Sequence, residues 1–159
     1  MPGRDREITL RFLAEPTDVN FGGKMFGGAV MKWIDLAGYA CATGWSGSYC
    51  VTAYVGGIQF EHPINIGALV ETRARLLLTG RTSMHIAVDV YSRMPTEAEW
   101  IRTTHCLMVF VATDALGKPT PVPSWKPSSA EDQAQAAYAE RMKALSLEVE
   151  AERARIRGS

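Results

Sequence analysis

Apolar and polar residues alternate near the start of the chain. Within residues 7–13, Ile8, Leu10 and Phe12 are separated by single polar residues, and this period of two predicts a β-strand. Pro16 and its polar neighbours end the pattern. Residues 20–28 follow as a glycine-bearing loop.

The next segment, residues 28–45, is apolar on nearly every side. Its only charged residues are Lys32 and Asp35. A helix that is apolar all round is normally buried. We therefore expect a long helix at the centre of the fold, ending at Gly44 and the Ser-Gly-Ser cluster of residues 46–48.

Four strand-like runs come next, at about residues 49–61, 68–78, 83–93 and 100–113. Period-two alternation supports them in residues 51–55 and again in residues 84–90. The proline-rich residues 114–127 indicate a covering loop or linker. Ser128 and Ser129, just before Glu131 and Asp132, are typical of a helix start. The apolar stripe of this C-terminal helix consists of Tyr138, Met142, Leu145, Val149 and Ile156.

The order of elements is one strand, one apolar helix, four strands and a terminal helix. Strands joined by short turns form an antiparallel sheet, and a fully apolar helix must be covered by that sheet. We predict the α+β class and a hotdog fold, with an antiparallel sheet of about five strands wrapped around a long central helix. Residues 1–127 would form this domain, and residues 128–159 an amphipathic helical extension.

Composition narrows the class of protein. A chain of 159 residues with 47% apolar and 21% charged residues suits one globular domain. The 17 basic and 17 acidic residues balance, so no net field attracts nucleic acid or an anionic membrane.

No apolar run is long enough to insert into a bilayer, and residues 1–12 lack the apolar core of a signal peptide. Cys41, Cys50 and Cys106 form no C-x-x-C pair, so we expect reduced core thiols and a cytoplasmic location.

Several enzyme motifs are missing from the sequence. It has no G-x-S-x-G nucleophile elbow, no phosphate-binding P-loop and no dinucleotide fingerprint. The three histidines, His62, His85 and His105, lie on separate segments without metal-ligand spacing. We therefore expect no metal and no cofactor.

The loop before the helix carries the first chemical signal. Gly27 and Gly28 lie where a helix start presents unpaired N–H groups and the positive end of its dipole. Glycine lets a ligand approach this backbone closely. One such donor can stabilise a developing oxyanion by about 3–4 kcal/mol. A tight turn or close packing explains the two glycines equally well.

Asp35 carries the second signal, since a carboxylate in an apolar helix is costly to bury and is a functional candidate. A structural role, as acceptor of hydrogen bonds from a loop, is the alternative. Gly28 and Asp35 are seven residues apart, which is about 10 Å along a helix axis. That is too far for both to contact one small reacting group. If both act on one substrate, they come from two subunits of a dimer.

These residues resemble a known family. Asn20, Gly23, Phe26, Gly27 and Gly28, followed by Met31 and Asp35, are similar to the signature of hotdog acyl-CoA thioesterases of the acyl-CoA hydrolase group. Two further stretches agree with that family, residues 60–70 and the turn Gly80-Arg81-Thr82-Ser83 before Met84. The resemblance covers roughly residues 7–123, and the combination is more specific than any one piece.

The resemblance implies hydrolysis of acyl-CoA to a fatty acid and free CoA. It implies Asp35 as the catalytic carboxylate, Asn20 as a group that orients the carbonyl or water, and Gly27 and Gly28 as the polarising helix start. The turn Gly80, Arg81, Thr82 and Ser83 would lie near the pantetheine and phosphates of CoA. The Arg81 guanidinium suits a phosphate, although a solvent-exposed turn arginine is the plain alternative. The partners implied are acyl-CoA and the chain itself, as a dimer assembled into a hexamer, a trimer of dimers.

Asp35 could act as general base or as nucleophile, and the sequence does not separate these roles. A dehydratase of 3-hydroxyacyl thioesters would need a histidine near the helix, and His62 lies on a strand end. A non-catalytic acyl-CoA-binding module would share the fold and the CoA site without needing Asp35.

Overall fold

The computed structural model describes residues 4–158; residues 1–3, at the start of the stretch expected to lack a signal peptide, and residue 159 lie outside this range. The fold is of the α+β class, as predicted. Its elements are β1 (Glu7–Leu13), the 3-10 turn η1 (Pro16–Asp18), α1 (Gly27–Ser46), β2 (Tyr49–Val55), β3 (Gln59–Phe60), β4 (Leu69–Thr79), β5 (Ser83–Arg93), β6 (Ile101–Thr113) and α2 (Ala130–Ile156).

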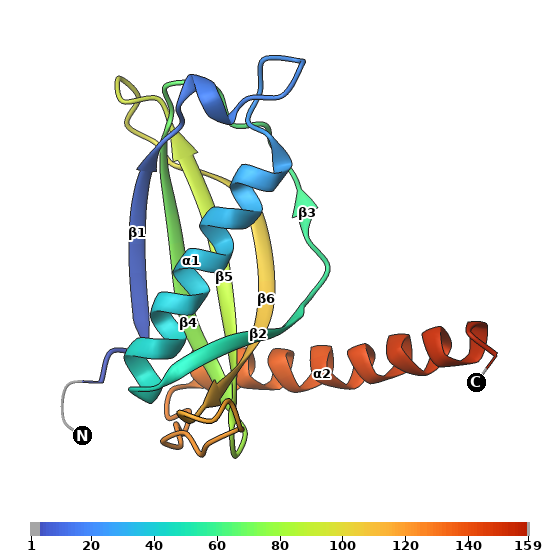
Figure 1. Ribbon diagram of the computed structural model, residues 1–159. Helices are drawn as coiled ribbons and strands as arrows, with labels where there is room; N and C mark the ends of the chain where they lie inside the picture. Colours follow the sequence, from blue (N-terminus) through green and yellow to red (C-terminus); the bar gives the residue numbers. More distant parts are fainter. Residues whose placement is uncertain (1–3, 159) are drawn as a thin grey trace.

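One curled antiparallel sheet runs in the order β1-β4-β5-β6-β2, and β3 also pairs with β6 (Figure 1). It has six strands instead of about five because the predicted strand 49–61 divides into β2 and β3. A bulge between Thr52 and Tyr54 starts the division. Gly56 continues it, since a Cβ there would lie 2.8 Å from the carbonyl oxygen of Leu107. The chain at Gly56 can therefore cross close over β6 only without a side chain.

The helix α1 lies in the curl of the sheet, as the hotdog prediction requires (Figure 1). Its core-facing side chains include Val30, Trp33 and Ile34. Gly38 brings the helix close to β6, because a Cβ there would lie 2.7 Å from the Phe110 ring. The apolar pattern of this segment therefore predicted the central helix correctly.

The expectation that α1 is buried on every side was wrong. Met31, Leu36 and Tyr39 are 47%, 41% and 37% exposed on the face that points away from the sheet. The neighbouring strand β2 is also largely exposed, and only Cys50 is buried in it. Since β2 pairs with β6 alone, its other edge is open. The chain lacks a cover for one continuous apolar face along α1 and β2.

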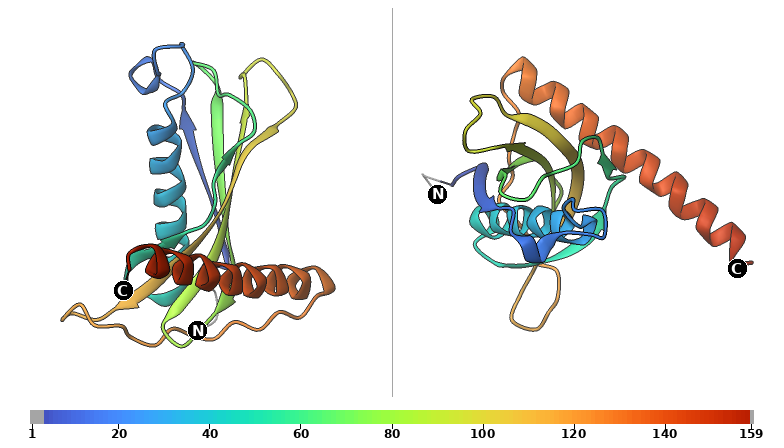
Figure 2. Two further views of the ribbon diagram at one scale, coloured as in Figure 1. Left: turned by 90° about the vertical axis from the view of Figure 1, so that its right-hand side faces the viewer. Right: turned by 90° about the horizontal axis from the view of Figure 1, so that it is seen from above.

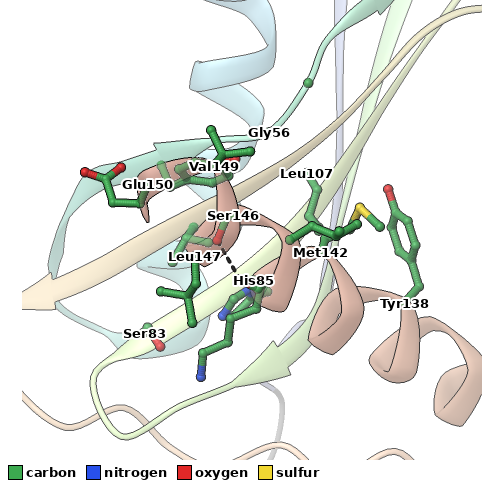
Figure 3. Close-up of a pocket in the computed structure, with 15 residues that line it drawn as sticks. Gly56, Ser83, His85, Leu107, Tyr138, Met142, Ser146, Leu147, Val149 and Glu150 are labelled. Atoms are coloured by element: carbon green, nitrogen blue, oxygen red, sulfur yellow. Dashed lines mark hydrogen bonds between the residues drawn. The ribbon is translucent and has the colours of Figure 1, made fainter. Parts of the chain in front are cut away.

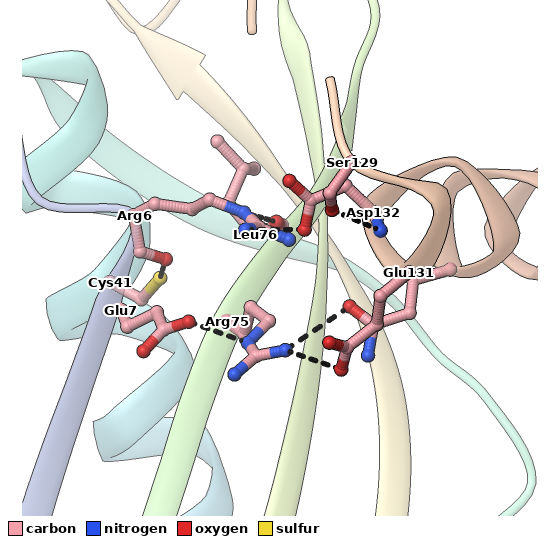
Figure 4. A network of polar contacts seen from close by, with 9 residues as sticks. Arg6, Glu7, Cys41, Arg75, Leu76, Ser129, Glu131 and Asp132 are labelled. Atoms are coloured by element: carbon pink, nitrogen blue, oxygen red, sulfur yellow. Dashed lines mark hydrogen bonds and ion pairs between the residues drawn. The ribbon is translucent and has the colours of Figure 1, made fainter. Parts of the chain in front are cut away.

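The helix α2 lies on the opposite side of the sheet from α1 (Figure 2). Ser129 caps it as predicted, accepting a hydrogen bond from the Asp132 N–H at 3.0 Å. Two ion pairs fasten its first turn to the sheet, Arg6 to Asp132 at 2.8 Å and Arg75 to Glu131 at 3.6 Å (Figure 4).

Only the first half of α2 packs against the sheet, and its buried residues are Ala136 and Ala139. Met142 contacts the same small cluster. The predicted apolar stripe is therefore only partly used, because the helix extends past the sheet edge (Figure 2) and leaves Val149 and Ile156 exposed.

Candidate active site

The start of α1 is held by its backbone and lacks a side-chain cap. The N-cap residue Phe26 donates its N–H to the Asp18 carbonyl at 2.6 Å, and its own carbonyl accepts from the Ala29 N–H at 2.9 Å. Within residues 4–158, the N–H groups of Gly27 and Gly28 have no acceptor. Two donors at the positive end of a 20-residue helix therefore remain available to a ligand.

The structure separates the reasons for the two glycines. At Gly28 an added Cβ would lie 2.3 Å from the Phe26 ring, which is 56% exposed and would have to move aside. At Gly27 an added Cβ would meet only the Phe60 ring at 3.7 Å, which is ordinary contact, and the backbone φ is not in the left-handed region. A side chain at position 28 would therefore displace the Phe26 ring, whereas a small one at position 27 would fit without such a change.

Asp35 lies on the uncovered face of α1 and is exposed, contrary to the expected burial. The reason is the period of the helix: Ile34 faces the sheet, and Asp35 is rotated out toward β2. Its Oδ1 accepts a hydrogen bond from the Thr52 Oγ1 at 2.8 Å. Thr52 therefore orients the carboxylate, a role that the sequence did not reveal because a threonine in a strand is unremarkable on its own.

Asn20 organises the loop before α1. Its Oδ1 accepts hydrogen bonds from the N–H groups of Gly22 at 2.9 Å and Lys24 at 3.2 Å. The Lys24 ammonium donates to Asn65 at 2.7 Å and ties this turn to the β3–β4 connection. The side-chain carbonyl of Asn20 is thus used within the loop, and its amide NH₂ is the part left for a substrate.

The predicted CoA turn is a rigid β4–β5 connection. The Gly80 N–H donates to the Ser83 carbonyl at 2.9 Å, and the carbonyls of Arg81 and Thr82 accept from neighbouring segments. The Arg81 guanidinium is exposed and has no partner in the described part of the chain. The turn presents a fixed backbone and a free cation, which together suit a phosphate.

The single chain does not assemble all these groups in one place. Asp35 and Thr52 meet, but Gly27 and Gly28 lie two turns away along α1. The turn at residues 80–83 lies at the other end of the sheet from the start of α1 (Figure 1). A helix start, a carboxylate and the turn expected to lie near the CoA phosphates are all present, but no one place in the single chain holds all three.

Residues 4–158 contain neither a cluster of metal ligands nor a membrane-spanning helix. No three His, Cys, Asp or Glu side chains there lie close enough together to hold a metal ion. No helix in the same range is long and apolar enough to cross a bilayer.

The sheet is curled around one helix, the start of that helix is uncapped, and a carboxylate lies on the helix face that the sheet does not cover. This combination is typical of the hotdog thioesterases. Residues 22–99 match the family model of the thioesterase superfamily. The acyl-CoA thioester hydrolase YciA of Salmonella typhimurium is 35% identical over 120 residues, which cover 74% of this chain and 90% of that protein. The chain belongs to the acyl-CoA thioester hydrolases of this superfamily and is a thioester-hydrolysing enzyme.

Solved structures agree over nearly the whole chain. The acyl-CoA hydrolase of Bacillus cereus superimposes with a TM-score of 0.88 and 26% identity, covering 96% of this chain and 93% of that one. Because α2 holds 27 of the 159 residues, this match includes most of α2. The acyl-CoA hydrolase of Staphylococcus aureus, solved with butyryl-CoA and CoA, has a TM-score of 0.82 and 26% identity, over 95% of this chain and 94% of that one.

Variants of the S. aureus enzyme have also been solved, each with one residue replaced by alanine: an asparagine, an aspartate or a threonine. Fifteen positions separate that asparagine from the aspartate, and seventeen separate the aspartate from the threonine. Asn20, Asp35 and Thr52 have the same two spacings in this chain.

Proposed function

We propose that this chain hydrolyses acyl-CoA thioesters to free carboxylic acids and CoA. One observation carries the proposal: two unpaired N–H groups start α1, and on the uncovered face of the same helix Thr52 orients the Asp35 carboxylate. A thioester hydrolase needs these two groups, a donor for the carbonyl oxygen and a carboxylate for the attacking water. The relatives named for acyl-CoA hydrolysis support CoA as the carrier.

The site is completed by a second copy of the chain. The open edge of β2 can pair antiparallel with the same edge of a partner, and this would cover the exposed Met31, Leu36 and Tyr39. Such a pairing inverts the partner, so its helix start approaches the Asp35 of the first subunit. The turn at residues 80–83 of the first subunit lies at the end of its sheet away from its own helix start (Figure 1), which is the end that the inverted partner's helix start approaches. Each site then takes Gly27 and Gly28 from one subunit, and Asp35, Thr52 and the turn from the other.

Assembly of three such dimers into a hexamer is part of the proposal. A hexameric acyl-CoA thioesterase that is 32% identical, over 94% of this chain with a TM-score of 0.84, supports it. The proposal needs no metal or organic cofactor, since CoA is part of the substrate. It assigns the reaction to the cytoplasm, and the three unpaired, buried cysteines are in keeping with a reducing compartment.

In the reaction, the thioester carbonyl accepts hydrogen bonds from the helix start as its oxygen gains negative charge. As general base, Asp35 takes a proton from water, the hydroxide adds to the carbonyl carbon, and the C–S bond breaks to release the CoA thiolate, which takes up that proton. As nucleophile, Asp35 would attack the thioester carbonyl and displace the CoA thiolate, giving a mixed anhydride that water then cleaves at the Asp35 carbonyl carbon to release the carboxylic acid. Single turnover in ¹⁸O-water separates the two routes, because only the nucleophile places solvent oxygen in the Asp35 side chain.

The test of the shared site is complementation. Gly27→Pro removes one N–H donor, and Asp35→Ala removes the carboxylate. In a mixed dimer of these two variants, one site has both defects and the other has neither. We expect each variant alone to keep about 1% of the wild-type activity or less, and confirmed mixed dimers to regain about half of the wild-type activity per dimer. Mixed dimers that stay inactive would exclude a site shared between subunits.

Two rival functions remain testable in the same assay of thiol release. A binding module would bind acyl-CoA without turnover, and Asp35→Asn would leave its affinity unchanged. A dehydratase would need a histidine beside α1. His85 and His105 instead belong to β5 and β6 and face α2, where His105 contacts Tyr138 at 3.0 Å.

A further inference from the structure

A cavity of about 500 Å³ lies between α2 and the outer face of the sheet (Figure 3). Its floor is one row across three strands, in which Tyr54 pairs with Val109 and Val109 pairs with His85. Its roof is the stretch of α2 that includes Met142 and Leu145. A mostly apolar cavity of this size with a few polar groups is typical of a site for a small molecule.

His85 is the polar group in the floor of this cavity. It is only 5% exposed, and its ring has no hydrogen-bond partner in the range 4–158. The ring lies below the α2 side chains that roof the cavity (Figure 3). Burial, and then the charge of Lys143, lower the pKa of His85, whereas Glu140 acts in the opposite direction. A neutral imidazole with unused hydrogen-bonding capacity therefore faces the cavity.

The cavity carries one cation at its roof. Lys143 lines it from α2, and its side chain has no ion pair in the part of the chain that the structure describes. Ser146 fixes the helix backbone at this point by donating to the Lys143 carbonyl at 2.7 Å (Figure 3). Glu150 is the only acidic side chain of the lining. Lys143 thus offers an anion a positive charge, and the neutral His85 offers a hydrogen bond to a polar group deeper in the cavity.

The position of the cavity links it to the proposed active site. Thr52, which orients Asp35, pairs with Phe110, one step along β6 from the Val109 of the cavity floor. The strand β2 ends at Val55, and the next residues, Gly56 and Gly57, line the cavity. The cavity therefore begins where β2 stops, on the face of the sheet opposite to Thr52 and Asp35.

The other end of the cavity meets the turn at residues 80–83. Ser83, its last residue, also lines the cavity. One space thus connects the end of β2, close to Asp35, with the turn whose Arg81 is free. A ligand that fits this space is long. It is apolar where it lies over the sheet and anionic at the end next to the turn at residues 80–83.

We infer that this cavity receives the CoA portion of the substrate, with α2 as the roof of the CoA site and Lys143 as a phosphate-binding residue. The pantetheine arm, with its amides and methyl groups, lies over the Tyr54–Val109–His85 row, and His85 hydrogen-bonds to an amide. The phosphates lie between Lys143 and the turn at residues 80–83. This assignment rests on the proposed function and gives α2 a role in binding substrate.

The test compares two substrates with the same acyl group, acyl-CoA and the N-acetylcysteamine thioester, which lacks the phosphates and most of the arm. In the full chain, Lys143→Gln should raise KM for acyl-CoA about tenfold, with kcat almost unchanged and no effect on the short thioester. Ser146→Trp, which fills the cavity from the roof, should raise KM for acyl-CoA in the same selective way. Arg141→Gln on the same helix, outside the cavity lining, is the matched control and should change neither KM.

An unchanged KM for acyl-CoA in both Lys143→Gln and Ser146→Trp would overturn the inference while leaving the proposed function intact. Equal losses on both thioesters would also overturn it, since they would report a general defect. If the wild-type chain hydrolyses neither thioester, the proposed function fails, and calorimetric binding of CoA itself tests the cavity. Tenfold weaker binding to Lys143→Gln would then support the CoA site, and equal binding would overturn it.

Discussion

The two helices of this protein begin in opposite ways. In α2 the Ser129 side chain takes the N–H of Asp132, and two acidic residues, Glu131 and Asp132, complement the dipole in the first turn. In α1 the N-cap is Phe26, which offers no side-chain acceptor, and the first turn has no acidic residue. The far end of α1 is capped normally by Gly47 in the left-handed conformation. The start of α1 therefore has neither a side-chain cap nor an acidic residue.

The difference between the two helix starts indicates that the start of α1 is the one suited to bind a ligand. A missing N-cap typically lowers stability by about 1 kcal/mol, so an open start that also has the backbone room of two glycines suggests a functional use. The α2 start instead carries a side-chain cap and two carboxylates, Glu131 and Asp132, which disfavour the binding of a further negative charge there. The chemistry we propose therefore depends on α1, and changes at α2 should alter stability or CoA binding instead.

The largest expected effect is at Asp35. Replacing it by asparagine keeps the size and the contact with Thr52 but removes the base, and we expect kcat to fall about 1000-fold. Thiol release from acyl-CoA measures this. Asp5→Asn, at an exposed position outside the site, should be as active as the wild type. Asp35→Asn with more than a tenth of the activity would rule out its catalytic role.

The open start of α1 should give the next largest effect. Gly27→Pro removes one N–H, and proline is tolerated at the first helical position because Phe26 already has an extended backbone, with ψ of 132°. We expect kcat to fall about 100-fold. Gly27→Ala keeps the N–H and meets only Phe60 at 3.7 Å, so it should stay within a few-fold of wild type. Equal rates for the two variants would contradict an oxyanion role for this N–H.

Thr52 should have an intermediate effect, because it acts through Asp35. Thr52→Val keeps the shape and removes the 2.8 Å hydrogen bond, and we expect kcat to fall about tenfold with KM almost unchanged. Thr52→Ser keeps the hydroxyl and should recover most of the rate. If serine is as impaired as valine, the hydroxyl is not what orients the carboxylate.

The smallest effect on rate should come from the capped helix. Ser129→Ala removes the hydrogen bond to the Asp132 N–H, and we expect about 1 kcal/mol less stability toward unfolding. The kcat for the N-acetylcysteamine thioester should not change. Ser128→Ala, next to the cap but without this contact, serves as the control in thermal denaturation. A loss of kcat in Ser129→Ala that equals the loss in Gly27→Pro would remove the distinction between the two helix starts.

Much of the fold could be predicted, because local patterns report local structure. The range 83–93 was predicted for β5 and observed without change, and the central helix was predicted to within one residue at each end. The division of residues 49–61 could not be predicted. It depends on how closely Gly56 approaches the Leu107 carbonyl, which is a contact between distant segments.

The site was also predicted only in part, because its residue types are visible in the sequence and the contacts between distant segments are not. Asp35, Asn20 and the two glycines stood out by residue type and by their resemblance to a family, and their catalytic roles stay predictions. Thr52 could not be found, because its contact with Asp35 joins a strand to a helix 17 residues away in the chain. The exposure of Asp35 was also missed, since periodicity shows that a helix is apolar but not how much of it the sheet covers.

The sequence by itself determined most of the secondary structure and the spacing that separates Gly28 from Asp35 along one helix. These follow from the 3.6-residue and two-residue periods, while the class of chemistry was implied by the resemblance to a family. Only the tertiary structure decided which face of α1 stays open, that Thr52 reaches Asp35, and that α2 roofs a cavity next to the residue 80–83 turn. The physical reason is that burial, bulges and cavities depend on contacts between segments far apart in the chain, and such contacts exist only once the sheet has curled around its helix.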